Sequence, residues 1–402
     1  MDNKKNLNLL IIVSALGYFV DVYDLLLFGV VKNASLTSIG IIEDQLSVGI
    51  ALTNFQVIGL VIGGIIWGIL GDIRGRLSVL FGSILLYSIA NICNAFVDNL
   101  TTYKICRFVA GIGLAGELGA GISLVMETAK RKNNYGPQII TGFGLLGAVL
   151  AGLIGDYFDW RTCYLIGGIM GLILLLLRFG VRDSYMFLEL KNKSEVVKGN
   201  FLMFFNNPSR LKRYFNSILI GLPVYFVIAL LIQSAKDLGE LDGLTVTSGK
   251  ATIVCYIAFS LSDFFFTYIS NLIKSRKKIF IGLHTLSFLM LLLFVFLPNT
   301  STFLFYLKYA LFGVAIGYWG LLTVNASEQF GTNMRALAST TIPNFIRGSF
   351  YFIGIAFTNL KGTFGLTNTI LYVGLGLIAI SFIASLFMQD NFNKDLDYIE
   401  EK

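Results

Sequence analysis

Long apolar runs follow one another along the chain with short polar connections between them. Twelve of these runs reach the length of roughly 20 mostly apolar residues that a helix needs to cross a bilayer. In chain order they are 8–31, 47–70, 77–97, 102–127, 138–157, 162–180, 213–235, 247–270, 279–297, 303–326, 338–360 and 366–388. The pattern predicts an all-α membrane protein with twelve transmembrane helices.

One connection is much longer and more polar than the others. It covers residues 181–212 and contains Arg182, Glu189, Lys191 and a turn at Asn207-Pro208. It divides the runs into two groups of six. We therefore expect a six-helix bundle over 1–180, a cytoplasmic linker over 181–212 and a second six-helix bundle over 213–402.

Lys and Arg are distributed unevenly between the two sides of the predicted helices. Most of the 31 fall on the side of the N-terminus, where Lys4 and Lys5 precede the first run. Cytoplasmic loops collect positive charge, which predicts both termini in the cytoplasm and a bacterial-type inner membrane. The first run lacks a small-residue cleavage site, and Asp21 and Asp24 interrupt it, so we interpret it as an uncleaved helix rather than a signal peptide.

Composition narrows the function classes. The chain is 55% hydrophobic and 14% charged, with a mean hydropathy of +0.74, whereas soluble domains carry about 25% charged residues. The net charge of +7 lies in short loops rather than on one basic face, which argues against nucleic acid. The four cysteines are isolated and form no Cys-x-x-Cys pair, so no metal, disulfide or cofactor is indicated.

A basic turn recurs in the two halves. Residues 68–76 follow the second run, and residues 270–278 follow the eighth, six runs later. An internal repeat of this kind is typical of transporters whose binding site lies between the halves near the membrane midplane.

The first of these turns, with Gly68, Asp72, Gly75 and Arg76, resembles the signature of the major facilitator superfamily. The resemblance implies two pseudo-symmetric six-helix bundles and a cytoplasmic gate. Gly75 permits the tight turn. Asp72 can cap the next helix and pair with a basic residue across the gate. The second copy has Asn271 where the family has Asp.

Two further motifs are similar to those of the metabolite:proton symporter and sugar porter-like branch of that family. One is the Arg-led, Gly-spaced run 107–119, which contains Glu117; the other is Asp21-x-Tyr23-Asp24 in the first helix. The fifth run lacks the Gly-Pro pair of the family's antiporters. The resemblance therefore implies symport.

The ends of the fourth and tenth runs complete the resemblance. Glu127 closes the fourth run, and Glu328 and Arg335 flank the polar stretch after the tenth. They look like the paired acidic and basic ends of the family's symporters, which implies that these residues join Asp72, Gly75 and Arg76 in the gate.

Charged residues within the apolar runs are the candidates for coupling. A charge at the bilayer centre costs at least ~2.5–3.5 kcal/mol, so such residues should face the bundle interior and have partners. Asp21 and Asp24 share one face of the first helix, and we expect Arg107 and Glu117 to point the same way from the fourth. The arrangement suits a carboxylate that exchanges a proton for an Arg partner; the alternative is a static ion pair that fixes packing.

Residues in the second half complete the candidate cavity. Arg347 can anchor a substrate carboxylate or extend to the cytoplasmic face. Among the many aromatics, Tyr23 and Tyr225 are our candidates for the pocket wall. His284, the one histidine, is expected to be a hydrogen-bonded packing residue.

These observations predict a monomeric, proton-coupled importer of a small polar, carboxylate-bearing metabolite. An exporter of a metabolite, siderophore or drug is the alternative within transport. A membrane enzyme is disfavoured because no nucleophile–base pair or phosphate loop is visible. A sensor is disfavoured because only 389–402 follow the last run.

Overall fold

The computed structural model describes residues 2–43, 45–128, 136–179, 198–392 and 398–400, and all regular structure in these ranges is helical. The first half contains α1 Asp2–Ser38, α2 Gln45–Arg74, α3 Arg76–Asn94, α4 Leu100–Leu114, α5 Glu117–Thr128, α6 Gly136–Leu145, α7 Gly147–Tyr157 and α8 Trp160–Leu177. The second half contains η1 Phe201–Phe204, α10 Pro208–Ile220, α11 Leu222–Tyr225, η2 Phe226–Leu231, α12 Ala235–Leu241, α13 Ser248–Ile273, α14 Arg276–Phe296, α15 Thr302–Ala315, α16 Trp319–Glu328 and α17 Arg335–Phe387.

The described helices account for twelve membrane passes. Eleven helical stretches are long and apolar enough to cross a bilayer. This number counts α17, with 53 residues, once, although it provides two passes. A straight helix of that length would extend about 80 Å, more than twice the ~30 Å of hydrocarbon. Gly365 breaks it with φ 75° and ψ 172°, values that glycine tolerates. The two parts of α17 are therefore separate passes, as the hydropathy pattern predicted.

Four passes are discontinuous. They are α4–α5, α6–α7, α10–α11–η2 and α15–α16, each of which the hydropathy pattern treats as one run. In the seventh pass, Pro223 lies in the first turn of α11, and the π-helix η2 follows directly. A proline removes a main-chain donor, and π segments are frequent at functional sites. Broken helices in a membrane protein are tolerated where they line a cavity.

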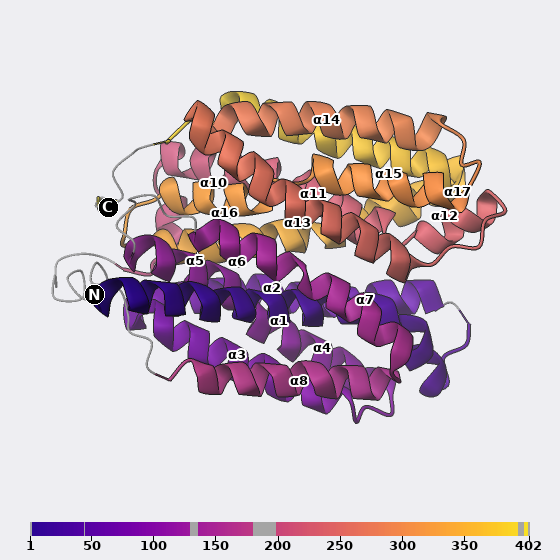
Figure 1. Ribbon diagram of the computed structural model, residues 1–402, viewed down its shortest axis with the longest axis horizontal. Coiled ribbons are helices and arrows are strands. Elements are labelled where there is room, and N and C mark those ends of the chain that lie inside the picture. Colours follow the sequence, from indigo (N-terminus) through magenta and orange to yellow (C-terminus); the bar gives the residue numbers. More distant parts are fainter. Residues whose placement is uncertain (1, 44, 129–135, 180–197, 393–397, 401–402) are drawn as a thin grey trace.

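The two halves lie side by side along the length of the molecule (Figure 1). Helices α1 to α8 form one half and α10 to α17 the other, and both ends of the chain lie at the same end of the molecule, which we call the terminal end. Residues 181–197 of the expected linker lie outside the described residues. The first long helix of the second half, α10, begins at Pro208, where the Asn207 side chain accepts hydrogen bonds from the main-chain N–H of Ser209 and Arg210.

Glycine allows the closest helix contacts within the first half. A Cβ at Gly147 of α7 would overlap the carbonyl oxygen of Phe19 in α1, and one at Gly111 of α4 would overlap that of Gln56 in α2. Small residues of this kind let membrane helices approach each other. The contacts hold α1 and α2, which carry site residues, against the rest of the bundle.

Candidate functional site

A cavity of about 620 Å³ opens between the two halves at the end opposite the termini, which we call the open end. Its wall comes from the second half of α1, the first half of α2, and the η2–α12–α13 region. The charged lining residues are Lys32, Arg107, Asp156, Lys236 and Asp237. The wall is therefore polar and of mixed charge, with one more positive than negative group.

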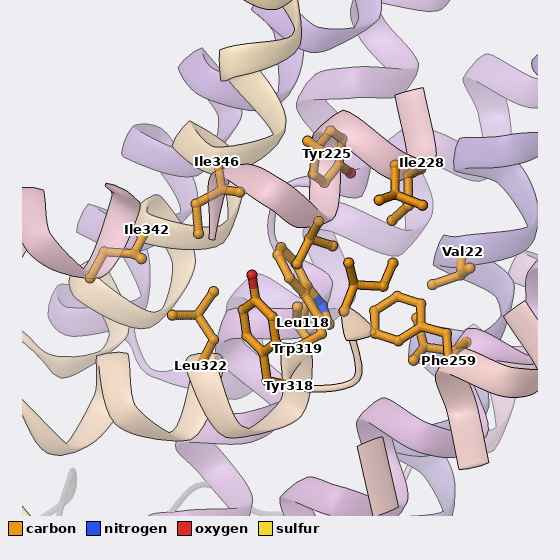
Figure 2. Packing of buried hydrophobic residues seen from close by; sticks show 14 of the residues in the cluster. Val22, Leu118, Tyr225, Ile228, Phe259, Tyr318, Trp319, Leu322, Ile342 and Ile346 are labelled. Atoms are coloured by element: carbon orange, nitrogen blue, oxygen red, sulfur yellow. The ribbon is translucent and has the colours of Figure 1, made fainter. Parts of the chain in front are cut away.

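The floor of this cavity is aromatic. A small pocket below it shares Leu25, Ile228 and Tyr256 with the cavity wall. Its remaining lining includes Tyr18, Tyr225, Phe259, Trp319 and Arg347. Figure 2 shows Trp319 between Tyr225, Ile228 and Phe259. Small-molecule sites usually have an apolar, aromatic wall with a few polar groups, and this pocket has that composition.

Two polar contacts join the halves at this floor. The indole Nε1 of Trp319 in α16 donates to the hydroxyl of Tyr18 in α1 at 2.7 Å. Nη2 of Arg347 in α17 lies 3.4 Å from Oδ2 of Asp21 in α1. Arg347 also lies over the Trp319 ring at 5.9 Å and is 2% exposed. Arg347 is thus inside the cavity floor rather than at the membrane surface.

Asp24 lies one turn beyond Asp21 but in a different environment. It is fully buried against Gly167 of α8, and neither carboxylate oxygen has a hydrogen-bond partner among the described residues. Oδ1 of Asp21 also has no such partner. Buried carboxylates of this kind carry a large desolvation cost while they are ionised.

Arg107 and Glu117 are not brought together. Arg107 lines the open cavity, donates to Gln56 Oε1 and lies over the Phe28 ring at 4.7 Å. Glu117 lies inside the first half and pairs with Arg178, whose Nη1 is 3.0 Å from Oε2. Ten residues rotate a helix by about 1000°, some 80° short of three turns. The break between α4 and α5 separates the two residues further.

The two tyrosines singled out from the sequence have different environments. Tyr225 lines the floor pocket, with its ring centroid 6.2 Å from that of Trp319. Tyr23 is buried within the first half and donates to the carbonyl of Cys163 at 2.8 Å. His284 is buried between the carbonyl of Ile220 at 3.1 Å and the Ser385 hydroxyl at 3.0 Å, an arrangement that serves packing.

The terminal end is closed by a buried charge network. Arg76, which follows Gly75 (φ 105°), contacts Glu127 Oε1 at 2.8 Å and the carbonyl of Thr332 at 3.2 Å. Arg335 of the other half lies 3.6 Å from the same Glu127 oxygen. Glu127 therefore connects basic groups from both halves.

Asp72 caps a helix of the opposite half. Its two carboxylate oxygens accept from the main-chain N–H groups of Ala336 at 3.1 Å and Leu337 at 3.0 Å, in the first turn of α17. The sequence suggested that Asp72 would cap the next helix, α3, and pair with a basic residue across the gate. The structure instead places it on the positive end of α17, with Arg76 3.3 Å away in its own half.

Side chains below the aromatic floor complete the closure. The hydroxyls of Ser123 in α5 and Ser339 in α17 are 2.7 Å apart. Asn344 donates to the carbonyl of Ala115 at 2.8 Å. The cavity thus has access from the open end, while α5 and α17 meet beneath it.

The second half repeats part of this network. Arg276 at the start of α14 contacts Glu328 Oε1 at 3.2 Å, as Arg76 contacts Glu127 in the first half. Asn271 accepts from Arg276 Nη1 at 3.0 Å. The arginine of the repeated turn therefore forms an ion pair with a glutamate of its own half in both halves.

The C-terminal residues pack on the same region. The carbonyl of Tyr398 accepts from the N–H of Thr332 at 2.8 Å, and Glu400 exchanges two hydrogen bonds with the Asn333 side chain. Glu400 also pairs with Arg213 at 3.1 Å. Burial raises the pKa of Tyr398 to about 12, so its phenol is neutral at physiological pH.

Sequence reasoning missed several residues of this arrangement. Arg178 lies near the end of the sixth run, where hydropathy cannot distinguish a loop arginine from a buried one. Tyr18 and Trp319 were not separated from the many other aromatics. Their depth along the predicted helices could have identified them, because Tyr18 lies at the level of Asp21 and Trp319 at the level of Arg347.

Known proteins match this chain over most of its length. A profile of the Major Facilitator Superfamily matches residues 14–355. The sialic acid transporter NanX of Escherichia coli is 24% identical over 396 residues, which cover 94% of this chain and 92% of that protein. The benzoate transport protein of Acinetobacter baylyi is 29% identical over 198 residues, but these cover 47% of this chain and 42% of that protein.

Solved structures share the fold. The proton:xylose symporter XylE superposes with a TM-score of 0.72 at 16% identity and covers 98% of both chains. The human organic anion transporter MFSD10 gives a TM-score of 0.73 at 13% identity, over 94% of this chain and 99% of that one. The resemblance in the turn after α2 is thereby confirmed across the whole molecule. The chain belongs to the Major Facilitator Superfamily and is a multi-pass membrane transporter of small molecules, not an enzyme.

Proposed function

We propose that this protein is a proton-coupled symporter that imports a small metabolite with a carboxylate group. The observation that carries the proposal is the Asp21–Arg347 ion pair, which joins the two halves at the floor of the cavity. It is the one place where an intramembrane acid and base from opposite halves meet beside an aromatic pocket, among the residues that the structure describes.

The pair suggests how substrate and proton are coupled. A carboxylate that enters from the open end competes with Asp21 for Arg347, whose planar guanidinium binds carboxylates well. Once displaced, Asp21 has no counter-charge in a buried setting, so it takes up a proton. Substrate, Arg347 and protonated Asp21 together carry no net charge, and the halves can then move without exposing an unpaired charge to lipid.

The remaining candidates have supporting roles in this proposal. Asp24, whose carboxylate has no hydrogen-bond partner among the described residues, is a second proton carrier. Arg107 meets the incoming anion in the cavity, and Glu117 belongs to the same coupling network through Arg178. Rocking of the halves closes the open end and separates the terminal end. Asp72, Gly75, Arg76, Glu127, Glu328 and Arg335 form the gate that opens in that step.

We assign the terminal end to the cytoplasm of a bacterial inner membrane, because the basic turns lie there. With that orientation the structure is outward-facing, as an importer awaiting substrate would be. One chain contains both halves of the site, so a monomer suffices, with bundle boundaries near 1–180 and 213–402. The lipid bilayer, protons and a small substrate are its proposed partners.

The relatives suggest which carboxylates to try first. Sialic acid, named for the relative with nearly full coverage, and benzoate and 4-hydroxybenzoate, named for partial matches, all carry one carboxylate. Purified protein should be reconstituted in proteoliposomes with a known orientation. An acid exterior should drive accumulation of at least one of these compounds, and a protonophore should abolish it.

Asp21→Asn tests the coupling. It should remove accumulation against a gradient and retain substrate exchange, because an amide keeps the shape but cannot carry the proton. Accumulation that survives Asp21→Asn would refute the coupling role. Transport that is driven only outward would favour the exporter.

A further inference from the structure

Helix α3 carries a polar face that neither the gate nor the cavity uses. Its members are Ser83, Tyr87, Ser88, Asn91 and Asn94, and we call this set the α3 polar face. Ser83, Tyr87, Asn91 and Asn94 recur at intervals of three or four residues, so they lie along one side of the helix. All five side chains are 0% exposed.

The polar atoms of these side chains lack protein partners. The hydroxyls of Ser83, Tyr87 and Ser88 and both amide atoms of Asn91 and Asn94 make no hydrogen bond within the described part of the chain. An unsatisfied polar group in a membrane interior costs several kcal/mol. Such groups are normally satisfied by buried water.

The middle of the α3 polar face, at Ser88, lies beside Asp24. A Cβ at Gly167 of α8 would overlap Oδ1 of Asp24, and a Cβ at Gly171, one turn further along α8, would overlap Oγ of Ser88. Glycines of α8 thus leave room for polar groups between α1, α3 and α8.

The Ser83 end of the α3 polar face lies beside the Glu117–Arg178 pair. Arg178 Nη1 donates to the carbonyl of Leu80 at 2.6 Å, one turn before Ser83. A Cβ at Gly116, the neighbour of Glu117, would be 2.8 Å from Cβ of Ser83. Arg178 follows the last residue of α8, at the end of that helix nearest the terminal end (Figure 1).

We propose that the α3 polar face is a hydrated proton pathway through the interior of the first half, which leads from Asp24 to the Glu117–Arg178 pair and the terminal end. The inference rests on the proposed proton coupling and adds the route of proton release. From Ser88, beside Asp24, to Leu80, beside Arg178, α3 extends about 12 Å, over a third of the ~30 Å of hydrocarbon.

The route separates the proton from the substrate. The carboxyl group of Asp24 gives up its proton and becomes a carboxylate. Each hydroxyl of Ser88, Tyr87 and Ser83, with water between them, accepts one proton and donates one, so none changes its state. One proton appears in water at the terminal end, while the substrate leaves between the two halves.

Hydroxyl-radical footprinting tests the hydration without any substrate. Radiolysis of buried water modifies the side chains next to it. Tyr309 is the matched control: it is also 0% exposed, but its hydroxyl donates to the carbonyl of Leu231 at 3.0 Å. In the purified full-length chain, Tyr87 should be modified at least ten times faster than Tyr309. Equal rates would overturn the pathway.

Transport of radiolabelled sialic acid tests conduction. Tyr87→Phe keeps the ring and removes the hydroxyl, and Tyr309→Phe makes the same change where the hydroxyl has a protein partner. Tyr87→Phe should slow net uptake driven by a proton gradient at least tenfold. It should leave exchange of labelled for unlabelled sialic acid within twofold, because exchange needs no proton release. Tyr309→Phe should change neither rate.

Failures of the two proposals can be distinguished. If the unmodified protein accumulates none of the tested carboxylates, the proposed function is wrong, and footprinting alone decides whether the α3 polar face is hydrated. If net uptake by Tyr87→Phe is unchanged, or falls in step with exchange, the pathway is wrong while symport stands.

Discussion

Asp72→Asn should open the terminal end. In the closed state the Asp72 carboxylate accepts from the N–H groups of Ala336 at 3.1 Å and Leu337 at 3.0 Å and lies 3.3 Å from Arg76. An asparagine can accept one of these hydrogen bonds through its single oxygen. Its NH₂ group would then face the second N–H, donor against donor.

The magnitude follows from these contacts. Loss of one hydrogen bond to a charged group costs about 1.5–3 kcal/mol, and loss of a negative charge at a helix N-terminus costs about 0.3–1 kcal/mol. Once the halves separate, water replaces these partners, so the cost falls on the closed state. A total of about 2–4 kcal/mol changes the ratio of closed to open molecules by roughly 30- to 700-fold.

Cysteine alkylation measures the shift. The reporter is Ser123→Cys, placed where α5 meets α17, in a background without the four native cysteines. A membrane-impermeant maleimide should react at least tenfold faster when Asp72→Asn is added. The matched control is Asp98→Asn, which removes a carboxylate from an ion pair with Arg161. The Asp98 side chain is 82% exposed, and exposed ion pairs contribute little to stability. If Asp72→Asn labels no faster than Asp98→Asn, the capping argument is wrong.

Three further predictions concern the site and the first half. Arg347→Lys should lower the affinity for a carboxylate substrate about 10- to 100-fold, because lysine cannot bind it bidentately; binding measured by calorimetry checks this, and unchanged affinity would remove Arg347 from the site. Glu117→Gln or Arg178→Met alone should destabilise the protein by about 3–5 kcal/mol, whereas the double variant should recover most of the loss; thermal unfolding in detergent should show this non-additivity. Gly147→Ala should reduce folded yield, because its Cβ meets a main-chain oxygen, while Gly376→Ala, with open space around it, should not; equal yields of monodisperse protein from the two would contradict the packing argument.

The sequence alone determined the twelve passes, and the reason is local. Each membrane helix satisfies its own main-chain hydrogen bonds, so every pass is visible as an apolar run without reference to its neighbours. The break at Gly365 was likewise anticipated by two separate runs, 338–360 and 366–388. The turn after α2 was recognisable because Gly75 and its charged neighbours form a compact motif in the sequence.

Only the tertiary structure decided which charges meet. Asp21 and Arg347 are 326 positions apart, and their contact depends on how two bundles face each other. Arg178 looks like a loop residue in hydropathy, yet it is 1% exposed beside Glu117. Periodicity shows which face of a helix is polar but not which element packs against that face. A break such as that between α4 and α5 also changes the direction in which later residues of the same run point. Which end is open, and which acids lack a partner, are properties of packing between helices, where the free energy depends on side chains that are distant in the sequence.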